Sequence, residues 1–159
     1  MKPLNPTRFS ILLGFAVPIR SGWADGEFFS ADPESDSVGS VAGTDGEVAV
    51  SVLYDRRWNV TLRLLQTSDE NLKCAALYNL KRVRHGGGVQ AGFFSFLAFH
   101  ADTNEYLVAP NACFSRPPTL TVDRTATVRE WSILLTDAEY GFNVEASSAR
   151  NLINSLRAA

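Results

Sequence analysis

The chain has 159 residues and a mass of 17.4 kDa, a length that predicts one domain spanning residues 1–159. Hydrophobic residues make up 45% and charged residues 20%, which excludes a disordered chain, a collagen-like chain and a long coiled coil. With 15 Lys and Arg against 17 Asp and Glu, the net charge is −2, without the basic excess usual in dedicated nucleic-acid-binding domains. Cys74 and Cys113 are too few for a disulfide framework and are expected to be small buried hydrophobic residues.

The first apolar run, Phe9–Val17, has two interpretations. It follows two basic residues and precedes a small-residue site at 22–24, which is the outline of a secretory signal. Pro18 and Arg20 interrupt that outline, so the favoured interpretation is a first β-strand. The run is too short to span a bilayer as a helix.

Most of the chain predicts strands. Residues 48–54 and 60–64 both alternate with the period of two that a half-buried strand requires. The intervening Asp55–Arg57 is short enough to join them as a hairpin. The run Phe93–Phe99 is apolar on both faces, which predicts that both faces are covered.

Three further segments predict strands. Tyr106–Ala109 and Thr119–Val122 are short and are separated by prolines, which suit edges and turns. Thr127–Thr136 alternates as well, but the phase of its apolar residues slips near Arg129 and Glu130. The slip predicts a β-bulge, or a strand that moves between environments.

Two segments predict helices. Thr67–Glu70 fits a capping box, with Thr67 as the N-cap and Glu70 reaching back. Basic residues crowd the last turn, and Gly86–Gly88 ends the helix. A short amphipathic helix is expected at Ser148–Arg157. The predicted fold is mainly β (α+β), a β-sandwich or barrel with one packed internal helix and a short C-terminal helix. The internal helix is expected to bury Leu72, Ala76, Leu80 and Val83.

The residues typical of catalysis are few. His85 is expected at a helix end, and His100 has neither a nucleophile nor a shaped pocket indicated beside it. Two cysteines and two histidines have no zinc-ligand spacing. The basic run at 81–85 is better explained as a helix C-terminus than as a phosphate site. We therefore expect no catalytic residue, no cofactor and no metal, and a role in binding or assembly.

The order of these features resembles a known family. Residues 43–80, GTDGEVAVSVLYDRRWNVTLRLLQTSDENLKCAALYNL, resemble the tail tube proteins of contractile-tailed bacteriophages. Gly22–Glu27 resembles the opening strand and turn of that family, and Pro117–Val122 with Arg124–Trp131 resembles its closing segment. The resemblance covers roughly residues 20–136 and leaves residues 137–159 as a C-terminal extension.

The resemblance implies a structural virion protein without enzyme activity or cofactor. In the family, hexameric rings join their inner sheets into one continuous barrel and stack into a tube inside a contractile sheath. The tube holds the tape-measure protein and later passes the genome. The implied partners are other copies of the chain and the sheath, baseplate or initiator, tail terminator and tape-measure proteins. DNA is implied to cross the channel without specific binding, no membrane is implied, and assembly is expected in the host cytoplasm.

Six residues are candidates for assembly contacts. Arg56 and Arg57, together with Asp55 and with Asp45–Gly46, are expected to flank a hairpin that contributes to the inner barrel or to the contact between rings. On the Phe93–Phe99 run, one face is expected in the subunit core and the other under the helix or a neighbouring subunit. The candidates on this run are Phe93, Phe94, Phe96 and Phe99.

Two alternatives stay open from the sequence. A monomeric, secreted β-sandwich could bind a ligand such as a glycan, using the signal-like start and the residues Trp23, Trp58 and Trp131. An enzyme could use His100 and Asp102.

Overall fold

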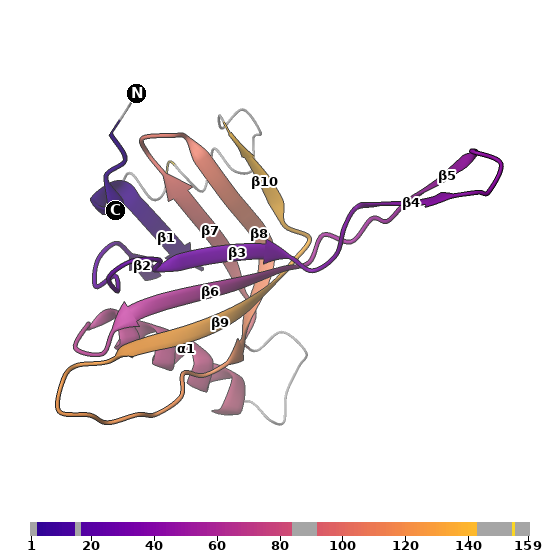
Figure 1. The fold of residues 1–159 in the computed structure, drawn as a ribbon. Helices are drawn as coiled ribbons and strands as arrows, with labels where there is room; N and C mark the ends of the chain where they lie inside the picture. Colours follow the sequence, from indigo (N-terminus) through magenta and orange to yellow (C-terminus); the bar gives the residue numbers. More distant parts are fainter. Residues whose placement is uncertain (1–2, 15–16, 84–91, 143–153, 155–159) are drawn as a thin grey trace.

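The computed structural model describes residues 3–14, 17–83, 92–142 and 154, without the side chains of residues 81–83. This part of the chain is mainly β with one helix (Figure 1). The elements are η1 (Pro6–Arg8), β1 (Phe9–Leu13), β2 (Val17–Ile19), β3 (Phe29–Pro33), β4 (Val38–Ala42), β5 (Val48–Val52), β6 (Trp58–Leu65), α1 (Glu70–Val83), β7 (Phe94–His100), β8 (Glu105–Arg116), β9 (Val128–Thr136) and β10 (Glu139–Phe142).

The main sheet of the described residues has eight antiparallel strands in the order β2-β1-β7-β8-β9-β6-β3, with β10 also paired to β8. It folds over on itself, so that β3, β6 and β9 face β1, β7 and β8 (Figure 1). The core lies between these two layers and includes Leu13, Leu62, Phe96 and Ile133, together with Cys74 of α1. The predicted mainly β fold with one packed helix is confirmed.

Strand β8 belongs to both layers. Its first half pairs with β7 and β10, and its second half pairs with β9. Between these halves the register with β7 shifts, because Phe96 pairs with Ala109 whereas Phe94 pairs with Ala112. Pro110 lies in the resulting bulge, where its missing N–H breaks no ladder hydrogen bond. The strand predicted at Tyr106–Ala109 is confirmed, and it continues past the proline to Arg116.

The two apolar runs form neighbouring strands in the main sheet. Phe9–Leu13 is β1, which pairs with both β2 and β7 and is largely buried, so the strand interpretation of this run is confirmed. In β7, Phe96 points into the core, whereas Leu97 and Phe99 lie in a second buried cluster on the opposite face. The expectation that both faces of this strand are covered is therefore confirmed within the subunit.

The N-terminus of α1 differs in detail from the predicted capping box. The Ser68 hydroxyl, one residue after Thr67, accepts a hydrogen bond from the Glu70 N–H at 3.2 Å. Gly22 packs against this cap with a φ of +78°, and a Cβ there would lie 1.9 Å from the Ser68 Oγ. Glycine is therefore required at position 22 by both backbone conformation and space.

The predicted buried face of α1 is wrong. Leu72 and Leu80 are 72% and 53% exposed, and Ala76 is exposed too, while the side chain of Val83 lies outside the description. The core face instead includes Cys74, with Ala75, Leu77 and Tyr78 partly buried around it. The rotation of the helix is fixed by a polar contact, because the Trp131 indole N–H donates to the Asn71 Oδ1 at 3.1 Å.

The predicted phase slip in β9 is also wrong. The pairing of β6 with β9 runs without interruption from Trp58 with Leu135 to Leu65 with Val128. Arg129 keeps the inward phase and is buried, because its guanidinium reaches polar groups of the preceding loop. The register shift in this region lies on β8, between Phe114 and Arg116.

The remaining predicted elements are either not formed or lie outside the described residues. Thr119–Val122 forms no strand and lies in the exposed loop between β8 and β9. After Thr136, β10 returns to the main sheet by pairing with the start of β8. The predicted helix at 148–157 lies outside the described residues except for Asn154, as do His85 and Gly86–Gly88. Within the described residues, no helix is long and apolar enough to cross a membrane.

Both cysteines are unpaired. Cys74 is buried, as expected, and burial raises the pKa of its thiol to about 12. Cys113 is only half-buried, so the expectation of two buried cysteines holds for Cys74 alone.

Candidate functional site

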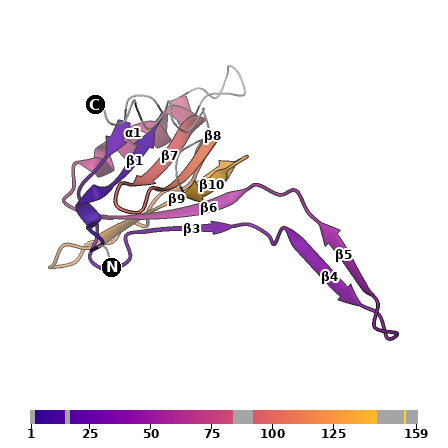
Figure 2. The same cartoon turned by 90° about the horizontal axis from the view of Figure 1, so that it is seen from above.

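A long arm projects from the body of the subunit. The arm comprises residues 34–57, and the body is the main sheet with α1 (Figures 1 and 2). Strands β4 and β5 form a separate two-stranded sheet within the arm. A two-stranded hairpin is marginally stable by itself in water, so the arm is a segment whose partner must be sought beyond the body.

The arm corrects the hairpin predicted from the sequence. Strand β5 pairs with β4, not with β6, and every residue of β5 is exposed. The segment Asp55–Arg57 is consequently not a hairpin turn but the base of the arm, where the chain re-enters the body at Trp58. The turn lies instead at Gly43–Glu47, where the Glu47 N–H donates to the Asp45 Oδ1 at 3.3 Å.

One face of the arm is rich in valine. Directly paired residues of an antiparallel ladder share a face. The pairs Val38 with Val52, Ser40 with Val50 and Ala42 with Val48 therefore form one surface, called the valine face below. Its four valines are between 56% and 62% exposed. An exposed apolar surface of this kind on a projecting hairpin is a candidate contact site for another molecule.

A network of side chains holds the base of the arm. The Asp55 carboxylate accepts hydrogen bonds from the Arg57 guanidinium at 2.7 and 2.9 Å and from the Ser35 hydroxyl at 3.0 Å. Hydrogen bonds from the Arg57 side chain and backbone hold the pKa of Asp55 well below its usual range. The Arg57 carbonyl also accepts from the Glu34 N–H at 2.9 Å. These contacts join the two sides of the arm.

Arg56 joins the base of the arm to the turn between β9 and β10. Its guanidinium lies 3.3 Å from the Asp137 Oδ1, and its carbonyl accepts from the Ala138 N–H at 2.9 Å. Both arginines thus contact their own subunit through part of their side chains, while each stays more than half exposed. Asp137 and Ser35 were not singled out from the sequence, and the contacts of Asp55 were not predicted, because acid–base pairs on a surface have no distinctive spacing in sequence.

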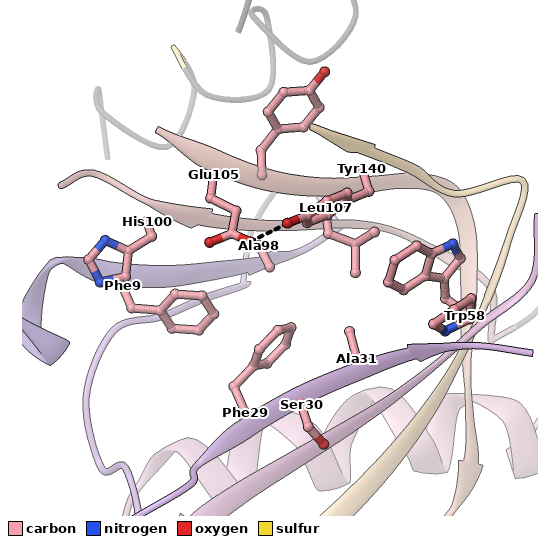
Figure 3. A pocket seen from close by; sticks show the side chains of 12 residues that line it. Phe9, Phe29, Ser30, Ala31, Trp58, Ala98, His100, Glu105, Leu107 and Tyr140 are labelled. Carbon is pink, nitrogen blue, oxygen red and sulfur yellow. Dashed lines mark hydrogen bonds between the residues drawn. The ribbon is translucent and has the colours of Figure 1, made fainter. Parts of the chain in front are cut away.

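A cleft opens between the two layers beside the base of the arm. Its volume is about 480 Å³, and Phe9, Phe29, Ala31, Trp58 and Leu107 form apolar walls (Figure 3). Tyr140 from β10 stacks on Trp58, with ring centroids 5.7 Å apart. The walls come from both layers, so the cleft marks where the sheet stays open between β3 and β10.

Two glutamates, one lining this cleft and one beside it, accept hydrogen bonds from tyrosines. The Tyr140 hydroxyl donates to Glu105 (Figure 3), and the Tyr106 hydroxyl donates to Glu139 at 3.1 Å. The hydrogen bond to Glu105 raises the pKa of Tyr140, and burial, followed by its hydrogen bond to Glu139, raises the pKa of Tyr106. Both phenols therefore stay protonated as donors, and these pairs stabilise the sheet edge instead of providing a nucleophile or base.

His100 and Asp102 do not form a catalytic pair. The Asp102 carboxylate lies 3.0 Å from the Arg8 guanidinium and also accepts from the Asn5 N–H at 3.1 Å. The His100 Nδ1 accepts from the Asp102 backbone N–H at 3.2 Å, so the carboxylate does not orient the imidazole. Among the described residues, no group of three His, Cys, Asp or Glu side chains is placed to hold a metal ion.

The structure separates the four phenylalanines that were candidates for assembly. Phe96 and Phe99 are 0% and 4% exposed and are buried within the subunit. Phe94 is partly buried against Phe114, at a centroid distance of 5.4 Å. Phe93 is 47% exposed, just before β7 begins. Phe93 therefore keeps an accessible ring, whereas Phe96 and Phe99 offer none to a neighbour.

The three tryptophans of the ligand-binding alternative are dispersed. Trp131 is buried in the core, and Trp23 stacks on Phe28 at 5.0 Å. Trp58 lines the cleft. They form no shared aromatic platform.

The outward face of β3, β6 and β9 is polar along the middle of the strands, with Leu65 and Val128 at one end and Leu134 near the other. It carries Ser30, Thr61 and Ser132 in neighbouring register positions. Its charged pair, Arg63 and Glu130, meets at 3.1 Å. This face therefore offers hydrogen-bonding groups with little net charge.

Known proteins share this architecture. No curated protein matches the chain in sequence. Among solved structures, the tube-terminating cap of the anti-feeding prophage is similar with a TM-score of 0.55 at 12% identity, covering 90% of this chain and 93% of that one. A chain of the PVC extracellular contractile injection system, from its sheath–tube complex in the extended state, has a TM-score of 0.54 at 14% identity, covering 89% and 93%. A chain of the PVC sheath/tube terminator has a TM-score of 0.53 at 14% identity, covering 89% and 98%.

The sequence itself matches a family over most of its length. Residues 14–141 match the family described as the bacteriophage PhiTE tail tube protein. The match includes the arm, the main sheet and α1, in agreement with the resemblance to phage tail tube proteins noted from the sequence. The chain therefore belongs to the PhiTE tail tube protein family of bacteriophages, and its role is that of a structural tube component.

Proposed function

We propose that the chain assembles into hexameric rings that stack into the inner tail tube of a contractile phage, and that the phage genome passes through this tube. The observation that carries the proposal is the arm, whose valine face is exposed in the subunit. Burying apolar side chains stabilises by about 25 cal/mol per Å² removed from water, so contact with further copies would stabilise this face. Such a role is structural and non-enzymatic.

The polar face of β3, β6 and β9 is the proposed channel wall. Small hydroxyl and amide side chains without an excess of basic charge suit a surface along which DNA slides, because phosphate binding is driven by excess basic charge. The net charge of −2 favours the same function. DNA would then cross the channel without specific binding.

The proposed partners follow from the family and from similar structures. Chains of this fold occur in a sheath–tube complex and in a sheath/tube terminator. We accordingly place this chain inside a sheath in the virion, with a terminator at the end of the tube and a tape-measure protein within it. Baseplate or initiator proteins would nucleate the first ring, and assembly would take place in the host cytoplasm.

The test is the assembly state of the purified protein. Light scattering and negative-stain electron microscopy across a concentration series should show rings and tubes with a central channel. A sample that stays a 17.4 kDa monomer at high concentration without denaturant would contradict the proposal. Rings with a symmetry other than sixfold would contradict the hexamer while leaving the tube role intact.

A further inference from the structure

An apolar cluster on the outer face of β1, β7 and β8 is buried, although the described residues form only one layer there. The five members of this outer cluster are 1–7% exposed in the single subunit. One face of an antiparallel sheet is normally solvated, so burial to this degree requires a cover. No described hydrophobic residue of α1, β3, β6 or β9 belongs to the cluster, because those elements pack on the opposite face. The members are Leu12, Leu97, Phe99, Tyr106 and Val108, with Ala101 packed against them.

A hydroxyl group on the same face indicates the same cover. Ser95 shares this face of β7 with Leu97 and Phe99, because alternate residues of a strand point the same way. The Ser95 Oγ is buried and has no hydrogen-bond partner among the described residues. Buried hydroxyl groups normally have a partner, so the cover is expected to carry polar groups beside apolar ones.

Strand β10 leads from the edge of the outer cluster into the C-terminal segment, residues 143–159. Gly141 of β10 pairs with Tyr106, and a Cβ at Gly141 would lie 2.9 Å from the Tyr106 hydroxyl oxygen. Glycine at this position therefore leaves room for the ring of a cluster member. Because β10 ends at Phe142 and lies beside β8, the C-terminal segment begins at the border of the cluster (Figure 1).

The sequence of the C-terminal segment fits an amphipathic cover. Its residues Ala149, Leu152, Ile153 and Leu156 have the spacing i, i+3, i+4, i+7 of one helix face. Asn154, the residue of this segment that the structure describes, is helical and exposed. With about 3.6 residues per turn, Asn154 falls on the side of the helix opposite those apolar residues. The other residues outside the description, 1–2, 15–16 and 84–91, have no comparable apolar spacing.

The C-terminal segment is also long enough to reach across the cluster. The sheet order β1-β7-β8, with β10 beside β8, places β1 three strand spacings from β10. At about 4.8 Å per spacing, this distance is roughly 14 Å. Residues 143–147 span up to roughly 17 Å when extended. A helix over Ser148–Arg157 would be about 15 Å long, which matches the width of the cluster.

We infer that residues 143–159 contribute an amphipathic helix that docks on the outer cluster of its own subunit. Leu152, Ile153 and Leu156 face the cluster, and the opposite side of the helix faces water. The outer cluster lies on the other side of the sandwich from the proposed channel wall, so the helix forms part of the outer surface of the tube. This placement on the tube rests on the proposed function, whereas the docking within the subunit does not.

Two leucines at adjacent positions of β1 test the docking. Leu12 belongs to the outer cluster, whereas Leu13 belongs to the core. Leu12→Ala and Leu13→Ala are each introduced into the full chain and into the chain carrying L152S/I153S/L156S. Urea denaturation is measured at a concentration where light scattering reports monomers. In the chain with the substituted helix, the fall in urea midpoint caused by Leu12→Ala should shrink to less than half, and that caused by Leu13→Ala should be unchanged.

A variant of the opposite helix side is the matched control. N151A/N154A/S155A should leave the effect of Leu12→Ala as it is in the unsubstituted chain. Equal effects of Leu12→Ala with and without L152S/I153S/L156S would overturn the docking. Circular dichroism establishes that each chain is folded, and the single substitution Ile153→Ala replaces the threefold variant in the same comparison if the latter does not fold.

Electron microscopy tests the placement on the tube. Tubes of L152S/I153S/L156S expose the outer cluster and should associate side by side, whereas tubes of N151A/N154A/S155A should stay dispersed. Dispersed tubes from the threefold variant would overturn the placement on the outer surface. Absence of rings and tubes in the unsubstituted protein would instead overturn the proposed function, and the comparison of Leu12 with Leu13 would still decide the docking.

Discussion

Strands β5 and β6 are neighbours in sequence and opposites in environment. Both alternate valine or leucine with smaller or polar residues. In β6, Val60, Leu62 and Leu64 are all but fully buried, whereas Val50 in β5 is 62% exposed. The same pattern thus builds the core of the subunit in one strand and a surface without internal cover in the next. The comparison shows that alternation specifies a strand with an apolar face but not the molecule that covers that face.

Truncation in the body should have the largest effect on folding. Phe96→Ala removes a fully buried ring from the core and should lower the free energy of unfolding by about 3–5 kcal/mol. Urea denaturation, at a concentration where light scattering reports monomers, measures this loss. If Val50→Ala, measured in parallel, lowered the free energy of unfolding by the same amount, the contrast between the body and the arm would be contradicted.

Removing the buried side chain of Arg129 in β9 should have the next-largest effect on stability. Arg129→Ala removes hydrogen bonds to the Thr121 carbonyl and Thr127 hydroxyl and should cost about 1–3 kcal/mol in unfolding free energy. Hydrogen exchange should show faster exchange at the Thr127 amide, which donates to Gln66. Unchanged stability and exchange would mean that the loop keeps its shape without this contact.

A substitution on the valine face should leave the fold nearly unchanged and act on assembly. Val50→Ser is expected to change the free energy of unfolding of the monomer by less than about 0.5 kcal/mol, because the side chain is exposed. Tube length in electron micrographs should fall, since the face loses apolar contact. Ala49→Ser on the opposite face of the same strand is the control and should assemble normally. Equal defects in both variants would argue against a one-sided contact.

The smallest expected effect concerns pH at the base of the arm. The Asp55 pKa is lower in the folded chain than in the unfolded one. Its stabilising contribution is therefore complete above the unfolded value, about 3.9, and is lost as the pH falls through the lower folded value. Between pH 7 and pH 4.5, the protection of the Leu53 amide, which donates to the Ser37 carbonyl, should stay constant. Asp55→Asn should reduce that protection at every pH in this range, and a wild-type loss between pH 7 and 4.5 would contradict the assigned pKa direction.

Much of the body could be predicted from the sequence. The strands at Phe9–Leu13 and Phe94–His100 are long apolar runs, and burial on both faces leaves them little alternative. The partner of β5 could not be predicted, because Val38 and Val41 in β4 fall on opposite faces and hide the strand period. Residues 119–122 show the reverse case, in which alternation is present but no neighbouring strand is available to pair with them.

The buried face of α1 and the contacts of the candidate site show a second limit of prediction from sequence. Leu72 and Leu80 are more apolar than Asn71, but Asn71 faces the body because the Trp131 indole requires an acceptor. Hydrophobic spacing along α1 contains no information about that requirement. Arg56 and Arg57 lie at the base of the arm, and their contacts with Asp137 and Asp55 depend on tertiary proximity, which the sequence does not show. Whether these arginines also contact a neighbouring copy stays a prediction.

The connection of the arm to the body has a mechanical consequence. The arm leaves from the ends of β3 and β6, which are paired to each other, so an axial pull on it draws both strands in the same direction. The load then passes to the ladder between β6 and β9, which joins eight residue pairs. Its hydrogen bonds lie perpendicular to the strands and are loaded together in shear, so none can be peeled open singly. A tube driven forward under tension or compression would in this way distribute force over a whole strand of each subunit.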